Sequence, residues 1–256
     1  MQVAGRGRIL FWEGASLWIM EALPRPGAVS NTTDYHSHHA IQVTLSLGGR
    51  FELRTKKLAV QGTAAVAPDA SHIFEARGLC ALLFIEPESE PGRAICESLF
   101  QRASLISIPE PLVADITKRL VDAYCSAPID ETVLEGLGRS LVARLAGLSS
   151  PKPPEPRVQK MIEFAAGHLD DSITLAAAAR SAGLSPSRAR HLFVEQTGLP
   201  FRTYLLWLKI MRAVGLFSNG KSLTAAAHEA GFADSAHFSR TFRRMFGIPA
   251  AALQIL

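Results

Sequence analysis

The sequence predicts a two-domain α+β protein in which a β-barrel followed by helices precedes an all-α domain. Three observations lead to this fold class: short alternating segments early in the chain, a proline-rich break, and two similar helical units after the break. With 256 residues, 48% of them hydrophobic, the chain is long enough to bury a core in each domain. We expect a first domain at 1–150, with a β part at about 1–88 and a helical part at about 89–150, a linker at 151–157 and a second domain at 158–256.

The β part is predicted from residues 7–86, which form short apolar runs separated by turn residues. In "IQVTLSLGGRFELRT", apolar and polar residues alternate from Ile41 to Leu47, and Gly48-Gly49 then turns the chain. This pattern is typical of two consecutive strands of one sheet.

After residue 90 the apolar residues follow helical spacing, which predicts that helices complete the first domain. One predicted helix has a strongly apolar face made by six side chains: Leu134, Leu137, Leu141, Val142, Leu145 and Leu148. Such a face packs either on the chain's own barrel or on a partner subunit, and the sequence leaves both open.

The segment "PKPPEP", residues 151–156, holds four prolines in six positions and predicts an extended linker. The charge balance changes across it. Residues 1–150 contain 14 Lys and Arg against 16 Asp and Glu, whereas the residues from Pro151 onward contain 13 against 7. A basic domain joined to a slightly acidic one indicates that the second domain binds nucleic acid.

The second domain contains one helical unit twice. "TLAAAARSAGL" begins with Thr174 as N-cap and ends at Gly183, and "SLTAAAHEAGF" begins with Ser222 and ends at Gly231. A helix of small residues, a glycine turn and a second helix form the helix-turn-helix plan. Residues 200–217 predict a connecting helix of about 27 Å, which can hold two reading helices roughly 34 Å apart, one turn of DNA.

The segment "HFSRTFRRMFG" shows how the second helix of a unit would meet DNA. Phe238, Phe242 and Phe246 recur every four residues, so we expect them to anchor the helix in the core of its domain. The arginines lie off this stripe. A helix fits the major groove, where side chains early in the helix reach base edges and later ones hold phosphates.

These segments resemble the C-terminal DNA-binding domain of the AraC/XylS family of bacterial transcription regulators, over about residues 158–250. The most specific match is "AAHEAGFADSAHFSRTFRRMFGIPA". The first unit departs from the family at His191, where an arginine is usual. The resemblance implies a transcription regulator of double-stranded DNA whose N-terminal domain is a cupin-like barrel that binds an effector or mediates dimerisation.

Candidate DNA contacts come from the resemblance and from charge. By position, the resemblance implies base contacts from both recognition helices: Ser187, Arg190 and His191 in the first, and Ala236, Ser239 and Arg240 in the second. Arg188 is a further source of the charge missing at His191. Charge and placement alone give the candidate phosphate contacts Lys209, Arg212, Arg243 and Arg244.

The segment "YHSHHAIQ" is the one place in the first domain where metal chemistry has to be weighed. His36, His38 and Gln42 share one face of a predicted strand, and His72 falls where a second strand can bring another imidazole across the barrel. The spacing resembles the first cupin motif, with Gln42 in place of its acid. We interpret these residues as an effector pocket with walls from Trp12 and Trp18; the alternative is a three-histidine site for zinc or iron(II) in a cupin-type metal-dependent enzyme.

We therefore predict a DNA-bound regulator without catalytic residues, resident metal or cofactor, controlled by a small-molecule effector. The family resemblance also implies a homodimer, and contact with RNA polymerase if the protein is an activator. The chain begins without a signal-peptide pattern, and its longest apolar run, Leu79–Ile85, is too short to cross a bilayer. We expect a cytoplasmic protein that does not contact membranes.

Overall fold

The computed structural model describes residues 3–24, 26–28, 30–147, 151–169 and 173–256. The chain forms two compact units, one of residues 1–151 together with 242–256 and the other of residues 152–241. The predicted domain division stays a prediction, because the last helix of the predicted second domain contributes residues to both units. Leu148, from the predicted apolar face, lies outside the described residues.

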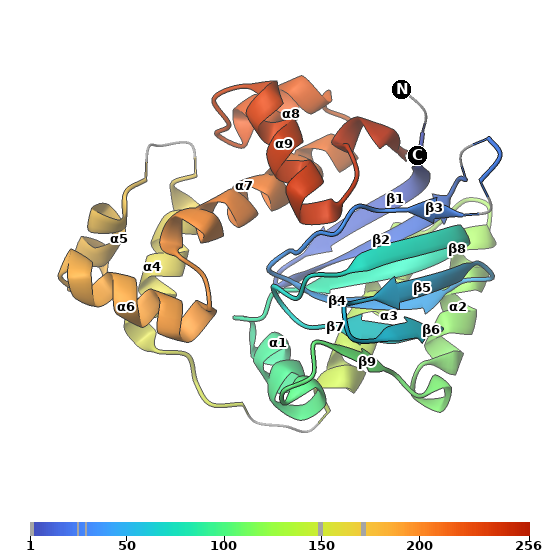
Figure 1. Cartoon of the computed structure of the whole chain (residues 1–256), viewed down its shortest axis with the longest axis horizontal. Helices are drawn as coiled ribbons and strands as arrows, with labels where there is room; N and C mark the ends of the chain where they lie inside the picture. Colours follow the sequence, from blue (N-terminus) through green and yellow to red (C-terminus); the bar gives the residue numbers. More distant parts are fainter. Residues whose placement is uncertain (1–2, 25, 29, 148–150, 170–172) are drawn as a thin grey trace. The chain divides into compact units, whose positions relative to one another are not determined.

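The first unit is built on strands that enclose a barrel interior (Figure 1). The strands are β1 (Gly5–Trp12), β2 (Ala15–Ala22), β3 (Asn31–Thr32), β4 (Ile41–Ser46), β5 (Arg50–Arg54), β6 (Ala59–Gln61), β7 (Ala64–Val66), β8 (Ile73–Ile85), β9 (Leu105–Ser107) and β10 (Leu253–Ile255). They follow the order β10-β1-β2-β8-β4-β7-β9, and β3 and β5 pair with the first part of β8. All pairs are antiparallel except β1 with β10, which is parallel with Gly5 opposite Leu253.

Strand β8 changes partners at Gly78, whose φ of +78° lies in the left-handed region that glycine tolerates best. The turn between β4 and β5 packs directly on this point. A Cβ on Gly49 would lie 2.6 Å from the carbonyl oxygen of Leu79, so glycine is required there. The predicted turn at Gly48-Gly49 is confirmed, and its second glycine closes the corner of the barrel.

Alternation along β4 separates two cores. Ile41, Val43 and Leu45 point to the face that the helices cover, and all three are fully buried. Gln42 and Thr44 point to the barrel interior and are also buried. Both faces of this strand therefore exclude water, and the polar residues on it need partners within the barrel.

The helices of the first unit are α1 (Glu90–Ile95), which continues as a π-helical turn (Cys96–Phe100), α2 (Ala114–Cys125) and α3 (Glu131–Ala146), with 3₁₀ turns at Glu110–Leu112 and Ala250–Ala252. Helices α2 and α3 lie behind the sheet in Figure 1. The apolar face of α3 packs in the same core as β2, β4 and β8, and its buried residues are Leu134, Leu137, Leu141, Val142 and Leu145. Of the two partners that the sequence left open, the chain's own sheet covers this face.

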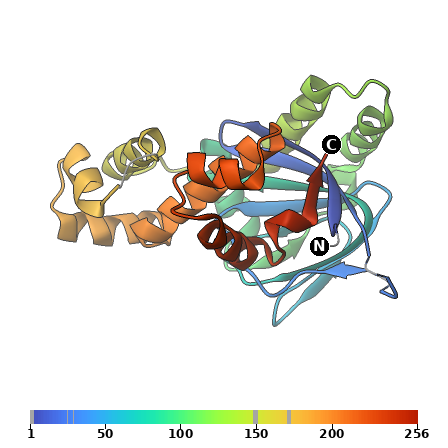
Figure 2. The same cartoon turned by 90° about the horizontal axis from the view of Figure 1, so that it is seen from above.

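The second unit consists of α4 (Pro156–Gly167), α5 (Leu175–Ser181), α6 (Pro186–Thr197), α7 (Phe201–Ser218), α8 (Leu223–Glu229) and the first part of α9 (Ser235–Phe246). Helix α4 begins at Pro156, within the predicted linker, because proline is favoured at the first position of a helix. Figure 2 shows α4, α5 and α6 around one end of α7 and α8 at its other end.

The predicted helix caps of the second unit are confirmed. The Thr174 hydroxyl accepts a hydrogen bond from the Ala177 amide at 3.2 Å, and the Ser222 hydroxyl accepts one from the Ala225 amide at the same distance. Alanines make the short helices narrow, and a core of alanines with Met161, Phe193 and Tyr204 fills the first helix-turn-helix unit.

Candidate nucleic-acid interface and barrel site

Helix α6 is the second helix of the first helix-turn-helix unit. Its N-cap Ser185 accepts a hydrogen bond from the Arg188 amide at 3.3 Å, and Ala189, Leu192 and Phe193 bury its inner face. The opposite face is exposed and carries all the candidate DNA contacts of this helix: Ser187, Arg188, Arg190 and His191. The helix therefore presents polar and basic side chains to solvent.

Helix α9 repeats this arrangement in the second helix-turn-helix unit. The Asp234 carboxylate accepts a hydrogen bond from the His237 amide at 2.6 Å, and this bond lowers the pKa of Asp234. Phe238 is buried and packs edge-on against Phe232, with ring centroids 5.4 Å apart. The candidate contacts on its other side are all exposed: Ala236, Ser239, Arg240, Arg243 and Arg244.

Helix α7 connects the two helix-turn-helix units and has 18 residues, which corresponds to about 27 Å. Two candidate phosphate contacts, Lys209 and Arg212, lie on it and are half-buried. The Lys209 ammonium donates a hydrogen bond to the carbonyl oxygen of Gly231 at 2.6 Å, at the turn after α8. This contact stabilises the second turn, and a phosphate role for Lys209 stays a prediction.

The C-terminal end of α9 packs in the first unit. The Phe246 ring stacks on Trp18 at 5.2 Å and lies edge-on to Phe84 at 5.7 Å. The Arg243 guanidinium donates two hydrogen bonds to the Asp34 carboxylate. The expectation that the whole phenylalanine stripe serves the core of the DNA-binding domain is therefore wrong at Phe246, because the aromatic interior of the barrel supplies its partners.

All three sequence-predicted pocket histidines meet inside the barrel. His36, His38 and His72 are buried, and one ring nitrogen of each lies within 4.8 Å of those of the other two. An isolated β-bridge between His36 and His72 holds two of them in register. Gln42 joins the group, since its Oε1 lies 3.0 Å from Nε2 of His38.

The Nδ1 atom of each histidine lies next to a backbone carbonyl oxygen. His36 faces the carbonyl of Asp34 at 2.9 Å, and His38 and His72 face those of Ala40 and Ala70 at 3.1 and 2.8 Å. A carbonyl only accepts hydrogen bonds, so each Nδ1 carries the proton and donates it.

The three imidazoles are neutral. Burial and the neighbouring His72 lower the pKa of His36 to about 3, and burial with the neighbouring imidazoles holds the pKa of His38 well below its usual value. Burial also lowers the pKa of His72. A low-dielectric interior disfavours the charged form of imidazole, so these side chains keep a lone pair on Nε2 at neutral pH.

A cavity of about 90 Å³ adjoins this cluster. Trp18, His36, Gln42 and Phe246 are among its lining residues, and the rest are mostly apolar. Trp12, the other predicted aromatic wall, is elsewhere: it packs in the helix-covered core, with the Arg139 guanidinium 5.5 Å from its ring centroid. The structure thus brings five of the six predicted pocket residues together.

His39 is a buried ionic residue that the sequence reasoning missed. Its ring nitrogens lie 2.8 Å from the Asp69 carboxylate and 2.7 Å from that of Glu88. Burial opposes protonation, but hydrogen bonds to both carboxylates outweigh it and raise the pKa of His39 to about 9. This charged residue fixes the segment that follows His38. Nothing in the local sequence distinguishes it from its neighbours, because its partners lie 30 and 49 residues away.

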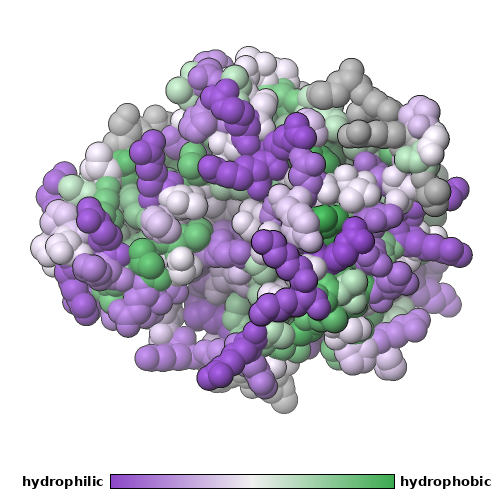
Figure 3. Space-filling model, viewed as in Figure 1, coloured by the Kyte–Doolittle hydropathy of each residue, from purple (hydrophilic) through white to green (hydrophobic). Residues whose placement is uncertain are grey.

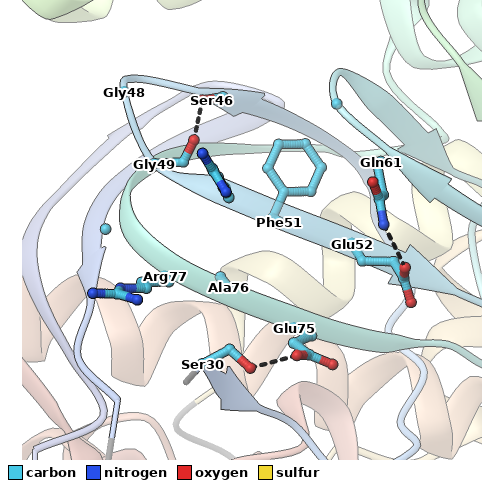
Figure 4. Close-up of a pocket in the computed structure, with 13 residues that line it drawn as sticks. Ser30, Ser46, Gly48, Gly49, Phe51, Glu52, Gln61, Glu75, Ala76 and Arg77 are labelled. Atoms are coloured by element: carbon cyan, nitrogen blue, oxygen red, sulfur yellow. Dashed lines mark hydrogen bonds between the residues drawn. The ribbon is translucent and has the colours of Figure 1, made fainter. Parts of the chain in front are cut away.

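A second, larger hollow of about 830 Å³ opens at another part of the barrel (Figure 4). Its polar groups largely bond to one another: Ser30 donates to Glu75, and Gln61 donates to Glu52 at 3.0 Å. Figure 4 shows the Phe51 ring between Gly49 and Gln61. The hollow is the larger space, whereas the small cavity adjoins the convergent histidines and is lined by His36 and Gln42. We therefore take the histidine cluster with this cavity as the candidate barrel site.

The geometry of residues 173–246 is that of tandem helix-turn-helix units, a class of DNA-binding domain. Comparison with known families agrees, since residues 178–254 match the model of the helix-turn-helix domain family. Among curated proteins, the chain is 34% identical over 91 residues to the HTH-type transcriptional activator RhaS of Escherichia coli, covering 35% of this chain and 33% of RhaS. It is 32% identical over 115 residues to the arabinose operon regulatory protein of Salmonella typhimurium, covering 43% of this chain and 41% of the relative.

The match to curated relatives thus spans well under half of their length. Solved structures extend the likeness in fold to nearly the whole chain. ToxT from Vibrio cholerae superposes with a TM-score of 0.58 at 10% identity, covering 93% of this chain and 95% of ToxT. A structure of ToxT with an unsaturated fatty acid bound gives a TM-score of 0.55 at 11% identity, with coverages of 93% and 95%.

These comparisons confirm the predicted fold class, a cupin-like barrel with helices followed by a tandem helix-turn-helix domain. They also agree with the family resemblance: residues 178–254 match the helix-turn-helix domain family, and this part of the chain is similar to RhaS and to the arabinose operon regulatory protein. Among the described residues, no helix has the length and apolar character needed to span a membrane.

Proposed function

We propose that the chain is a sequence-specific DNA-binding transcription regulator of the AraC type. The observation that carries this proposal is the repetition of one capped unit, in which an apolar face holds the second helix and a polar, basic face remains exposed. A single amphipathic helix is common in any protein. Two in one chain, joined by a connecting helix that can hold them about one DNA turn apart, favour reading of two successive major-groove segments.

Base edges would be read by residues near the start of each recognition helix, and Arg240 is the side chain best suited to a guanine. Arg188 and Arg190 would supply the charge around His191 in the first helix. Arg244 would bind phosphate, as would Arg243 when it leaves Asp34. This assignment rests on exposure and position within the helices.

The barrel would control DNA binding through an effector. Support comes from the cavity beside the histidines and from the bond between Asp34 in the barrel unit and Arg243 on α9. The ToxT structure with a bound fatty acid shows that a protein of this fold takes a ligand. A homodimer would need a surface other than the apolar face of α3, because that face is packed on the chain's own sheet. On the face drawn in Figure 3, apolar areas are small and scattered among hydrophilic side chains.

The rival function, a cupin-type metal-dependent enzyme, is less well supported because the curated relatives are regulators of transcription. For an activator, contact with RNA polymerase would follow. Selection of bound fragments from the source genome by the purified chain tests the regulator directly. We expect a small set of enriched fragments with two conserved motifs about 10 base pairs apart. The variant Arg190→Ala/Arg240→Ala should lose the enrichment while remaining folded; absence of enriched fragments with the unaltered chain would contradict the proposal.

A further inference from the structure

Three buried histidines from two separate segments of the barrel converge on one point. Their approaching ring nitrogens all lie within 4.8 Å of one another. We propose that the barrel binds a divalent transition-metal ion through His36, His38 and His72, and that this ion is the effector of the regulator.

The proton on Nδ1 of each histidine leaves Nε2 as the atom that can bind a metal ion. Each Nδ1 donates to a backbone carbonyl, of Asp34, Ala40 or Ala70, which fixes the ring orientation and puts the lone pair on Nε2. In His38 this Nε2 lies next to the Gln42 side chain. Histidines that bind metals almost always donate their other N–H to an oxygen in this way. If the three histidines only filled the core, they would not require the same tautomer at each position. Their remaining ring nitrogens would also not have to converge.

The Nε2 atom of His72 adds an independent observation. His72 has no exposed surface, and its Nε2 has no hydrogen-bond partner among the described residues. Buried nitrogen atoms in proteins are nearly always bonded, so an acceptor left without a donor indicates a missing ligand. A metal ion at the convergence point would satisfy it.

The three imidazole ligands and the volume of the adjoining cavity indicate which kind of ligand the site binds. Three neutral imidazoles suit zinc, iron(II), cobalt or nickel rather than calcium or magnesium, which prefer oxygen. The Oε1 atom of Gln42 lies 3.0 Å from Nε2 of His38, and its amide nitrogen donates to Thr44. In this orientation the oxygen can face a bound ion, and a half-turn of the amide group would let its nitrogen donate to Nε2 in the metal-free protein. The adjoining cavity of about 90 Å³ has room for the ion and a few waters. An organic effector needs several times this volume, so it does not fit in the cavity beside the histidines.

The site is connected to α9 by a short chain of bonds, and its regulatory role rests on the proposed function. The Asp34 carbonyl accepts from His36, and the Asp34 amide donates to the carbonyl of Gly247 at 2.9 Å. The carboxylate of the same residue accepts from Arg243. A ligand that shifts His36 therefore acts on a residue that holds the end of the recognition helix.

Titration of the metal-free full-length chain with Co(II), followed by visible absorption, tests the binding. We expect a d–d band that saturates at one equivalent and is displaced by Zn(II). His72→Ala should lower the Co(II) affinity by about 100-fold or more, whereas His228→Ala, a change at an exposed histidine of α8, should leave it unchanged. Gln42→Glu replaces a weak ligand by a carboxylate and should raise the affinity about tenfold or more, which keeps the test decisive if His72→Ala does not fold. No band, or an equal band in folded His72→Ala, would overturn the site.

Binding to DNA with and without bound metal tests the regulatory role. Removal of the metal by a chelator should change the affinity of the chain for its enriched DNA fragment by about fivefold or more, and His72→Ala should not respond. A metal-binding chain whose DNA affinity does not change would overturn the effector role. Failure to bind DNA in either state would contradict the proposed function, while the Co(II) band would still report the site.

Discussion

The Arg243 guanidinium is bonded to the Asp34 carboxylate, with Nε 3.0 Å and Nη2 2.7 Å from the same oxygen. The two residues are 209 positions apart in the sequence, one on the recognition helix α9 and the other at the edge of the barrel. Both side chains are largely exposed, so solvent and salt weaken the pair and its contribution to stability is small. Its importance lies in competition, because a guanidinium held by a carboxylate is withheld from a DNA phosphate.

We expect Asp34→Asn to raise the affinity for DNA of any sequence by roughly two- to fivefold at low salt and to steepen the salt dependence by up to about one unit. The reason is that Arg243, no longer bonded to the carboxylate of residue 34, becomes available to bind a DNA phosphate. Asp122→Asn, an exposed carboxylate on α2 with the same change in net charge, is the matched control. In an Arg243→Ala background the Asp34 change should have no further effect; an equal gain there would contradict competition between Asp34 and phosphate. Electrophoretic or fluorescence binding across a salt series measures both.

Gly247→Ala should destabilise the packing of the chain's C-terminal segment on the barrel. Gly247 has a φ of +70°, and a Cβ there would lie 2.6 Å from the Asp34 carbonyl oxygen and 2.7 Å from Nδ1 of His36. Gly198, after α6, is its counterpart in the first helix-turn-helix unit. Its φ is +76°, and a Cβ there would meet no atom of the described residues within 4 Å.

Both alanine variants incur the strain of positive φ, on the order of 1 kcal/mol, and only Gly247→Ala adds the collision. Urea unfolding should therefore show a larger loss for Gly247→Ala. Equal losses in the two variants would mean that the segment after α9 does not rest on Asp34 and His36 in solution.

Arg240 and Arg244 should behave differently, because Arg240 lies early in α9 and Arg244 one turn later. Arg240→Ala should weaken the cognate site selectively, by roughly 1–3 kcal/mol if the side chain makes a bidentate bond to guanine. Arg244→Ala should weaken cognate and scrambled DNA alike and lower the salt slope by about one unit. Titrations of both duplexes at several salt concentrations separate the two effects, with circular dichroism as the folding control. Equal loss on both duplexes with Arg240→Ala would make Arg240 a phosphate contact.

The Asp115–Arg144 pair should make stability depend on acid pH. Arg144 donates to the Asp115 carboxylate, and these hydrogen bonds lower the pKa of Asp115 to about 2. Because the folded-state pKa is below the unfolded value near 4, the stabilisation is present above pH 4 and is lost as the pH falls towards 2. Asp115→Asn should lower the urea midpoint slightly at pH 6, and the difference should vanish near pH 2. A difference that persists unchanged at pH 2 would rule out the charge of Asp115 as its source.

Short-range patterns in the sequence were enough to predict the repeated DNA-binding unit. Thr174 and Ser222 cap their helices, alanines make the close packing possible, and glycines end both turns, all within a few residues of the groups they bond. Local hydrogen bonding and helical periodicity decide such features, so they follow directly from neighbouring residues. The alternation of β4 and the turn at Gly49 were predictable for the same reason.

Contacts between residues that are far apart in the sequence were decided only by the tertiary structure. Sequence spacing placed His36 and His38 together, but the histidine tautomers depend on carbonyls, such as that of Ala70, which the folded strands bring into position. His39 is charged because Asp69 and Glu88 arrive from other segments. Phe246 fits its helical stripe equally well in either core, and the aromatic interior around Trp18 determines which one it enters. Burial, pairing and pKa are properties of such long-range neighbours, and one-dimensional periodicity carries no information about them.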